Sequence, residues 1–396
     1  MFSIFPLKNG LDNVAGFFTQ GVSAGFKPNG KEDVAFIRAD EPCDITACFT
    51  TNAFQAAPIK HYLKYPQGFQ SNFILMNAKN ANAMTGAEGI ADIEALFERL
   101  RAVYPTLHNP IMSSTGVIGY RLNVDKLSTA FEKFDFQAHN SHATASAIMT
   151  TDSFKKELCF KVELDDGKAF HIAAICKGAG MINPAMATML CFILTDADIP
   201  KADMEELLTP SVEQSFNAVS VDGDTSTNDT VILMASKKSG VYAKKAFQEA
   251  LNRITKELSL MLVRDGEGST KVVAFEVSGA KNKVEAEKAA KALSNSLLVK
   301  TAIFGEDPNW GRIASTIGAS GVTCNEESLV IHYDDVLIYC HEKRSLDEAT
   351  EKKAAAVMQK ESYKIQCDLG VGDAIFTAYG CDLGHEYVKI NADYRT

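Results

Sequence analysis

The threonine at position 188 stands out because its hydroxyl interrupts an otherwise apolar stretch. It follows a glycine-rich segment, 177–183, and two small residues, Ala185 and Ala187, and it precedes the apolar run 189–195. A run of that length and composition predicts a buried strand. A threonine hydroxyl becomes a nucleophile only when a neighbouring base activates it. By pattern alone, Thr188 is therefore interpreted as a strand residue that packs its methyl group.

Two other stretches match ligand-binding motifs only in part. Residues 220–230 (SVDGDTSTNDT) have the spacing of a calcium loop, but the glutamate that closes an EF-hand is missing. We predict a solvated turn with capping side chains there. Residues 370–372 (GVG) begin like a phosphate-binding fingerprint, but Ile375 occupies the third glycine position. Neither motif supports a site.

Cysteine and histidine usage gives no metal site. The nine cysteines form no CxxC pair, and the eight histidines form no HExxH motif and no zinc-type spacing with cysteine. Several cysteines lie in apolar runs, where a thiol behaves as a small hydrophobe. We predict a reduced, cytoplasmic protein with no bound metal.

The elements that must position any site are mixed along the chain. Apolar residues that alternate with polar or turn residues, or that form short runs, predict strands, and apolar residues at helical spacing predict helices. The predicted strands are 45–50, 73–76, 160–164, 170–174, 189–195, 230–234, 272–277, 329–331, 336–339 and 387–390. The predicted helices are 93–103, 247–261, 283–298 and 346–360. This mixture predicts α/β layers.

Composition narrows the class of protein. A chain of 396 residues is long enough for two or more domains. The net charge of −10 argues against a nucleic-acid partner, because phosphate binding needs a basic face. No stretch approaches the roughly 20 apolar residues of a membrane span. The N-terminus, MFSIFPLKNG, lacks the features of a targeting segment.

Taken together, motifs along nearly the whole chain resemble the ornithine acetyltransferase family, the glutamate N-acetyltransferases of arginine biosynthesis. Their joint order is what makes the resemblance specific. The matching segments are 21–26 (GVSAGF), 77–82 (NAKNAN), 114–119 (STGVIG), 147–152 (AIMTTD), 177–190 (KGAGMINPAMATML), 221–230 (VDGDTSTNDT), 265–268 (DGEG), 304–312 (FGEDPNWGR) and 390–396 (INADYRT).

The resemblance implies a self-processing enzyme. It implies a layered α/β sandwich of the N-terminal-nucleophile type, with a smaller C-terminal α/β domain from about residue 240. The precursor would cleave itself between Ala187 and Thr188, giving fragments 1–187 and 188–396. These would stay together as a heterotetramer with two copies of each fragment. The new α-amine of Thr188, with an ordinary pKa of about 7.7–8.0, would activate the adjacent hydroxyl.

The reaction implied by the resemblance is acetyl exchange. Acetyl would pass from N2-acetylornithine to Thr188 and then to glutamate, with no cofactor or metal. The resemblance leaves open whether acetyl-CoA is also a donor, which would make the enzyme multifunctional. It implies small-molecule substrates and no nucleic-acid or membrane partner.

Family correspondence also assigns site residues. Thr115 and Gly116 would donate hydrogen bonds to the oxyanion of the reaction intermediate. Alternatively, Gly116 serves to adopt an unusual backbone angle, and both roles could hold at once. The substrate positions carried over are Thr151, Lys177, Thr188, Glu267, Asn391 and Thr396. Lys177 and Glu267 suit the carboxylate and amine of an amino acid, although on their own they would be interpreted as solvated residues.

Three departures from the family pattern and two rival functions remain. Ala53 stands where arginine is common, Met84 where cysteine is common, and Gly384-His385 also differs. These leave the reaction class intact but bear on substrate range. The nearest rival is a related self-processing threonine amidohydrolase or aminopeptidase, in which water accepts the acyl group. The other is an uncleaved amino-acid-binding protein.

Overall fold

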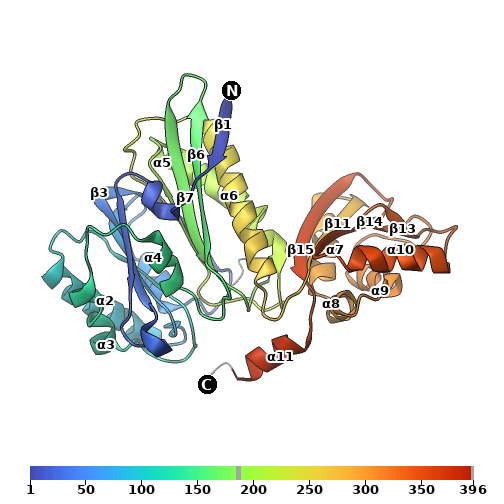
Figure 1. The fold of residues 1–396 in the computed structure, drawn as a ribbon, viewed down its shortest axis with the longest axis horizontal. Helices are drawn as coiled ribbons and strands as arrows, with labels where there is room; N and C mark the ends of the chain where they lie inside the picture. The colour runs from blue at the N-terminus through green and yellow to red at the C-terminus, as the bar shows by residue number, and fades with distance from the viewer. Residues whose placement is uncertain (184–188, 394–396) are drawn as a thin grey trace. The chain divides into compact units, whose positions relative to one another are not determined.

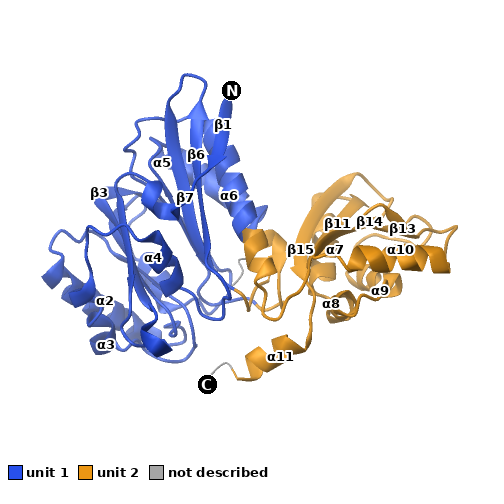
Figure 2. Ribbon diagram, in the orientation of Figure 1, with its two compact units in different colours: residues 1–178, 185–216, 225–258 blue, residues 179–184, 217–224, 259–396 orange. Residues whose placement is uncertain are grey.

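The structure is a computed structural model that describes residues 1–183 and 189–393 (Figure 1). The predictions for Ala187, Thr188 and Thr396 therefore lie outside the described residues. The chain forms two compact units (Figure 2). Within the described ranges, unit 1 comprises residues 1–178, 189–216 and 225–258, and unit 2 comprises 179–183, 217–224 and 259–393.

Unit 1 is built on one sheet, nine-stranded over the described residues. Its strands pair antiparallel except β8 with β10 and β4 with β5, which are parallel. In spatial order they are β1 (Phe2–Pro6), β6 (Lys156–Leu164), β7 (Ala169–Lys177), β8 (Leu190–Thr195), β10 (Thr230–Ala235), β3 (Val34–Phe49), β4 (Gln70–Asn77) and β5 (Ile111–Ser114), and β2 (Phe17–Val22) also pairs with β3.

Helices cover both faces of this sheet because successive strand residues point to opposite sides. Phe36 and Phe73 pack against the α2 helix on one face, whereas Ala35 and Ile37 pack with Ala145 of α4 on the other. The helices of unit 1 are α1 (Ala57–Tyr62), α2 (Gly86–Val103), α3 (Val124–Ser128), α4 (Ser141–Ala147), α5 (Lys201–Glu213) and most of α6 (Lys244–Arg264), with 3-10 turns η1 (Gly10–Asn13), η2 (Pro28–Gly30) and η3 (Phe131–Lys133).

Unit 2 contains a second, smaller sheet, six-stranded over the residues that the structure describes. Its order is β13 (Val336–Tyr339), β12 (Val330–Tyr333), β14 (Ser362–Asp368), β11 (Val272–Ala280), β15 (Ala374–Cys381) and β9 (Val219–Ser220). Phe275 on β11 is fully buried in the core that β11 forms with the flanking helices. The remaining elements are α7 (Lys283–Asn295), α8 (Leu297–Phe304), α9 (Trp310–Ala319), α10 (Glu348–Met358) and α11 (His385–Ala392). The 3-10 turn η4 (Phe216–Ala218) begins with the last residue of a unit 1 segment and continues into unit 2.

The predicted layers of helix and sheet, with a smaller α/β unit towards the C-terminus, are confirmed. Two element predictions are wrong. Residues 387–390 belong to the α11 helix, none of whose residues is buried, so the alternating apolar residues there do not mark a strand. The predicted helix 283–298 is two helices, because Ser296 is extended and its hydroxyl caps α8. Among the described residues, no helix is long and apolar enough to span a membrane.

Truncating the core of unit 1 should be costly. Phe192 lies in the central strand β8 with no exposed surface, so Phe192→Ala should lower the free energy of unfolding by about 3–5 kcal/mol. Urea denaturation followed by circular dichroism measures this change. The matched control is Phe54→Ala, since Phe54 is 61% exposed and its loss should cost within about 0.5 kcal/mol. Equal stability of the two variants would contradict the assigned core.

Candidate active site

The strands on either side of position 188 are neighbours in unit 1. β7 pairs antiparallel with β8, placing Lys177 opposite Leu190, and β8 pairs in parallel with β10, placing Leu190 opposite Thr230. The buried Met189 donates its N–H to Asp229 Oδ1 at 3.0 Å and accepts from the Thr230 N–H at 3.0 Å. The backbone directly after position 188 is therefore fixed on both sides. The strand prediction for 189–195 is confirmed, with β8 beginning at Leu190.

Lys177 and Thr115 come together although they are 62 residues apart in the chain. Both are buried, with 3% and 4% of their surface exposed, and Lys177 Nζ donates to Thr115 Oγ1 at 3.3 Å. Thr115 directly follows β5 and donates its own N–H to the Asn77 carbonyl at 3.0 Å. Interpreting Lys177 as a solvated lysine is therefore wrong, because the strand β7 carries it inside the unit.

Gly116 is required by its backbone. Its φ is +134°, and a Cβ atom there would overlap the carbonyl carbon of Lys79. Both constraints exclude any residue other than glycine at this position. The unusual backbone angle expected of Gly116 is confirmed.

The second half of the polar loop 220–230 is not a solvated turn. Residues 226–230 are all buried, and Asn228 Nδ2 donates to the carbonyls of Ala81 and Ser114 at 2.6 and 2.9 Å. The prediction is wrong because these polar side chains satisfy buried backbone groups of neighbouring loops instead of facing water. Asn228 thereby fixes the ends of the segments that present Thr115.

Asp229 is a buried carboxyl beside the start of β8. Burial is the largest influence and raises its pKa well above the ordinary value, against the opposing effects of the Met189 N–H bond and the positive charge of Lys177. Sequence reasoning assigned this carboxyl no role of its own. The signal that could have found it is its position inside the matching segment 221–230.

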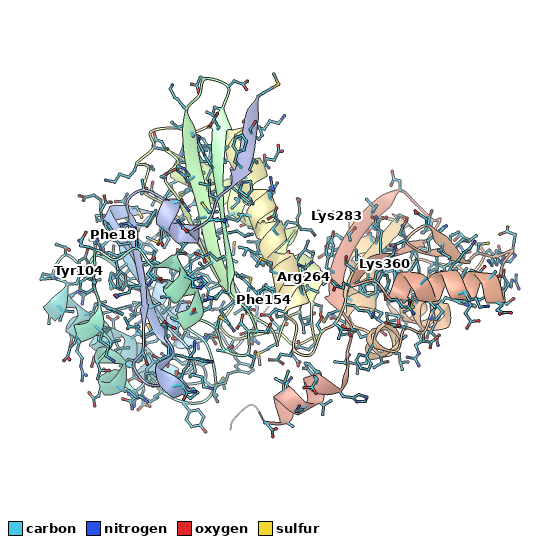
Figure 3. All side chains as sticks on the ribbon, viewed as in Figure 1. Phe18, Tyr104, Phe154, Arg264, Lys283 and Lys360 are labelled. Carbon is cyan, nitrogen blue, oxygen red and sulfur yellow. The ribbon has the colours of Figure 1, made fainter. Side chains whose placement is uncertain are left out.

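Asp152 fixes the loop that contains Thr151. Its inaccessible carboxylate accepts hydrogen bonds from the Gly178 N–H at 2.7 Å, the Thr150 N–H at 3.0 Å and Lys156 Nζ at 2.8 Å. Lys156 Nζ also lies 4.9 Å from the ring centroid of Phe154, which Figure 3 labels.

The surroundings of Asp152 determine its pKa. Burial opposes the charged form of Asp152, but the positive charges of Lys177 and Lys156 outweigh burial and lower the Asp152 pKa to about 2. Sequence reasoning missed this residue too.

In unit 2 the structure brings Glu267 and Asn391 together. Glu267 is only 8% exposed, and its Oε2 accepts from Asn391 Nδ2 on α11 at 2.7 Å. Its N–H donates to the Ala179 carbonyl at 2.9 Å, and a Cβ on Gly180 would overlap the Glu267 carboxylate. Interpreting Glu267 as a surface residue is therefore wrong. A glycine at 180 lets the chain pass directly over this carboxylate.

Asp222 anchors the same part of unit 2. It accepts from the N–H groups of Met181 and Ile182 at 2.6 and 2.9 Å and from the Tyr387 hydroxyl at 3.3 Å. Burial, the largest influence, raises the Asp222 pKa. The carboxyl thus ties the segment before position 184 to α11. Its role was not predicted.

The predicted site residues are divided between the units. Thr115, Gly116, Thr151 and Lys177 lie in unit 1, and Glu267 and Asn391 lie in unit 2. The departures Ala53 and Met84 are exposed, and Gly384 precedes α11 with extended backbone. In the described ranges, no group of three or more His, Cys, Asp or Glu side chains could hold a metal ion.

Buried hydroxyl, amine and carboxyl groups around the start of a strand are side-chain types that enzymes use for acyl transfer and proton transfer.

Comparison with known proteins identifies the family to which the chain belongs. The ArgJ family model matches residues 18–396. The arginine biosynthesis bifunctional protein ArgJ of Wolinella succinogenes is 59% identical, covering 100% of both chains, and that of Chlorobaculum tepidum is 41% identical, covering 96% of each. A solved structure of the Bacillus halodurans protein is 38% identical and covers 51% of this chain and 97% of that one, with a TM-score of 0.48.

The chain belongs to the ArgJ family. It is an acyltransferase of arginine biosynthesis.

Removing the Asp152 charge should destabilise the protein in a pH-dependent way. The folded pKa lies below the ordinary value of 3.8, so the contribution is present above about pH 4 and lost as the pH falls towards 2. Asp152→Asn should therefore lower the free energy of unfolding by about 2 kcal/mol at pH 7. Urea denaturation at pH 7, 5 and 3 should show equal differences at the first two values and a smaller one at the third. Asp125→Asn, at a side chain that is 88% exposed, is the control. A difference that persists unchanged at pH 3 would refute the linkage.

Proposed function

We propose that this enzyme transfers acetyl from N2-acetylornithine to glutamate through an acetyl ester on Thr188, after cleaving its own chain between Ala187 and Thr188. The main support is the buried contact between Lys177 Nζ and Thr115 Oγ1. This contact joins two residues to which the family resemblance assigns separate roles, substrate binding for Lys177 and oxyanion stabilisation for Thr115.

Self-cleavage would begin with attack of Thr188 Oγ on the Ala187 carbonyl carbon. The peptide C–N bond breaks as the ester forms, and the Thr188 nitrogen takes the proton to become an α-amine. Water then hydrolyses the ester and releases the carboxyl end of fragment 1–187. The fixed backbone of Met189 and the buried carboxyl of Asp229 support this step, because an attacking residue must be held in place by its neighbours in the chain.

In the first half-reaction, Thr188 Oγ attacks the acetyl carbonyl and ornithine leaves with its α-amine protonated. The α-amine of Thr188 accepts the hydroxyl proton. Lys177 donates to Thr115 Oγ1, so the O–H of Thr115 remains available to donate to an oxyanion. The Gly116 N–H would be the second donor. One such donor is worth about 2.7–4 kcal/mol in a transition state.

In the second half-reaction, the neutral α-amine of glutamate attacks the ester carbonyl and the C–O bond to Thr188 breaks, giving N-acetylglutamate. The proton lost by the attacking amine passes through the Thr188 α-amine to Thr188 Oγ. In the first half-reaction, Glu267, oriented by Asn391, would bind the side-chain ammonium group of N2-acetylornithine, and Lys177 a substrate carboxylate. Thr151 and Thr396 are the remaining proposed substrate contacts. Because Thr188 itself carries the acetyl group, the exchange needs no cofactor.

The wider properties of the enzyme rest on the same resemblance. Acetyl-CoA as a second donor would account for the bifunctional activity named for the relatives. We propose an α2β2 assembly of the two fragments. All nine cysteines are free thiols, which supports a reducing, cytoplasmic environment.

Thr188→Ala should give a folded chain that is neither cleaved nor active, because both steps need the same hydroxyl. Denaturing electrophoresis with N-terminal sequencing should show two wild-type fragments, the second beginning Thr-Met-Leu-Cys. Incubation with N2-acetylornithine and glutamate should yield ornithine and N-acetylglutamate. Thr209→Ala, at an exposed helical threonine, is the control. Acetate in place of N-acetylglutamate would identify a hydrolase, and exchange by the Thr188 variant would exclude this nucleophile.

Glu267→Gln should weaken substrate binding more than turnover. A hydrogen bond to a charged group contributes about 1.5–3 kcal/mol, so KM for N2-acetylornithine should rise roughly 10- to 150-fold with a smaller change in kcat. Steady-state kinetics measure both constants. Glu276→Gln, which alters a carboxylate paired with Lys364 on the sheet of unit 2, should leave KM unchanged. An unaltered KM in the Glu267 variant would remove this residue from substrate recognition.

A further inference from the structure

Unit 1 contains a cavity of about 470 Å³ whose walls carry four lysines, Lys27, Lys31, Lys79 and Lys155. The lysines come from the η2 region, the loop after β4 and the segment before β6. The whole protein has a net charge of −10. A concentration of ammonium groups around one cavity of an acidic chain favours the binding of an anion there.

Lys27 is held firmly at the wall of this cavity. Its Nζ donates to the carbonyls of Ser146 and Ala147, the last two residues of α4, at 2.9 and 3.0 Å. Burial, the largest influence, lowers the Lys27 pKa to about 8, while the charges of Asp33, Asp152 and Glu32 oppose that decrease. An anion in the cavity would favour the charged lysine. The ammonium is therefore fixed in position and partly desolvated.

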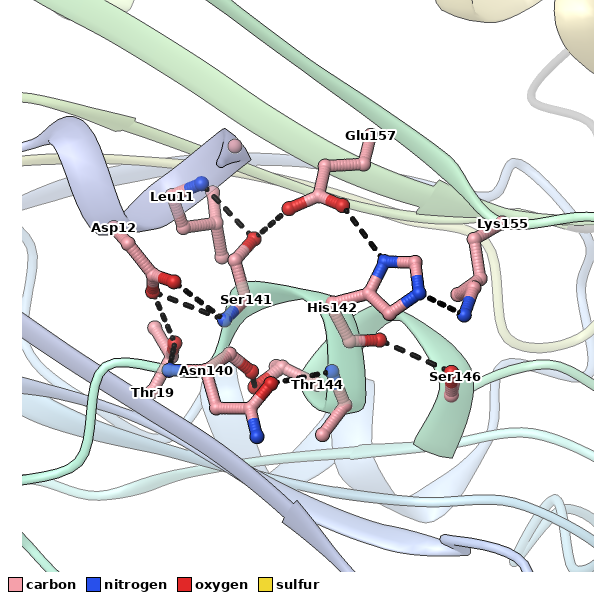
Figure 4. A network of polar contacts seen from close by, with 12 residues as sticks. Leu11, Asp12, Thr19, Asn140, Ser141, His142, Thr144, Ser146, Lys155 and Glu157 are labelled. Atoms are coloured by element: carbon pink, nitrogen blue, oxygen red, sulfur yellow. Dashed lines mark hydrogen bonds and ion pairs between the residues drawn. The ribbon is translucent and has the colours of Figure 1, made fainter. Parts of the chain in front are cut away.

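Lys155 is also held in place. Its Nζ contacts His142 Nε2, and His142 Nδ1 lies 3.5 Å from Glu157 Oε2 (Figure 4). If Lys155 donates, His142 is neutral and carries its proton on Nδ1, facing the carboxylate. A chain of polar contacts thus orients this lysine from the α4 helix and β6.

The carboxylates near these lysines are fewer than the lysines themselves: Asp33, Glu32 and Asp152 act on Lys27. In the part of the chain that the structure describes, none of the four makes an ion pair. Two carboxylates, Glu32 and Asp152, line the cavity. Asp152 is already paired with the buried Lys156. The cavity therefore retains excess positive charge.

The cavity adjoins the residues assigned to acyl transfer. The backbone of Lys79 packs directly against Gly116. Thr150 and Asp152, which line the cavity, flank Thr151 in sequence. A ligand anchored at the lysines could thus extend towards the loop that contains Thr115. The cavity volume falls within the roughly 300–1,000 Å³ typical of small-molecule sites.

We propose that this lysine-lined cavity binds the closely spaced phosphate groups of an anionic ligand, either a phosphorylated acyl carrier such as coenzyme A or a free polyphosphate. Paired phosphates suit several lysines better than one carboxylate does, because they supply more charge and more acceptors. The link to an acyl carrier rests on the proposed acetyl transfer, whereas the phosphate site does not.

Direct binding to the full chain tests the site without reference to activity. Isothermal titration would use coenzyme A, adenosine 3′,5′-bisphosphate and inorganic pyrophosphate, each at low and high salt. Binding should weaken with salt, because exposed charges are screened. Lys31→Gln combined with Lys155→Gln should raise Kd at least about tenfold. The control, Lys60→Gln with Lys64→Gln, removes two exposed lysines of unit 1 that do not line the cavity and should leave Kd unchanged.

Comparing the three ligands distinguishes a phosphorylated acyl carrier from a free polyphosphate. Tighter binding of coenzyme A and the bisphosphate than of pyrophosphate supports a phosphorylated carrier, and equal binding of pyrophosphate supports a free polyphosphate. No binding by any ligand, or the same Kd in the cavity variant and the control, overturns the site, provided that circular dichroism shows a folded variant. Acetyl exchange from N2-acetylornithine, measured on the wild type, tests the proposed function separately, so either can fail without the other.

Discussion

The register of three adjacent strands, β7, β8 and β10, is the constraint on which the unit 1 part of the site depends. It places Lys177, Leu190 and Thr230 side by side at one end of the sheet. A slip by one residue would turn Lys177 to the opposite face and break the pairing of Met189 with the chain at 229–230. All six residues of β8 and of β10 are buried, so a slip would disrupt close side-chain packing on both faces of these strands. Burial of apolar surface therefore fixes the position of the polar groups.

Two carboxyl groups near Lys177 show how local contacts decide charge. Asp152 lies near two lysines and accepts three hydrogen bonds, and its pKa falls to about 2. For Asp229, burial outweighs the Met189 N–H and the charge of Lys177, and its pKa rises. Burial alone raises a carboxyl pKa, and only several opposite charges and donors together reverse it. The same region thus holds one fixed negative charge and one carboxyl that favours its proton.

The sequence was informative where pattern and burial agree. The apolar runs at 189–195 and 230–234 correspond to β8 and β10, and the mixed periodicity predicted α/β layers. It failed at 387–390, where apolar side chains at short spacing lie on an exposed helix. It also failed for Asn228 and Asp229, because their polar types favour a solvated loop and only tertiary pairing shows what they bond. Residue types carry no direct information about such long-range contacts.

The predicted site residues illustrate a further limit of local reasoning. Lys177 and Glu267 would each be interpreted as solvated residues from the sequence, and each is in fact buried with a specific partner. Burying a polar group without a hydrogen bond costs free energy, so such a residue persists only where the fold supplies that partner. Lys177 and Thr115 satisfy each other within unit 1, as Glu267 and Asn391 do within unit 2. Each pair is therefore already positioned inside its own unit by contacts within the protein.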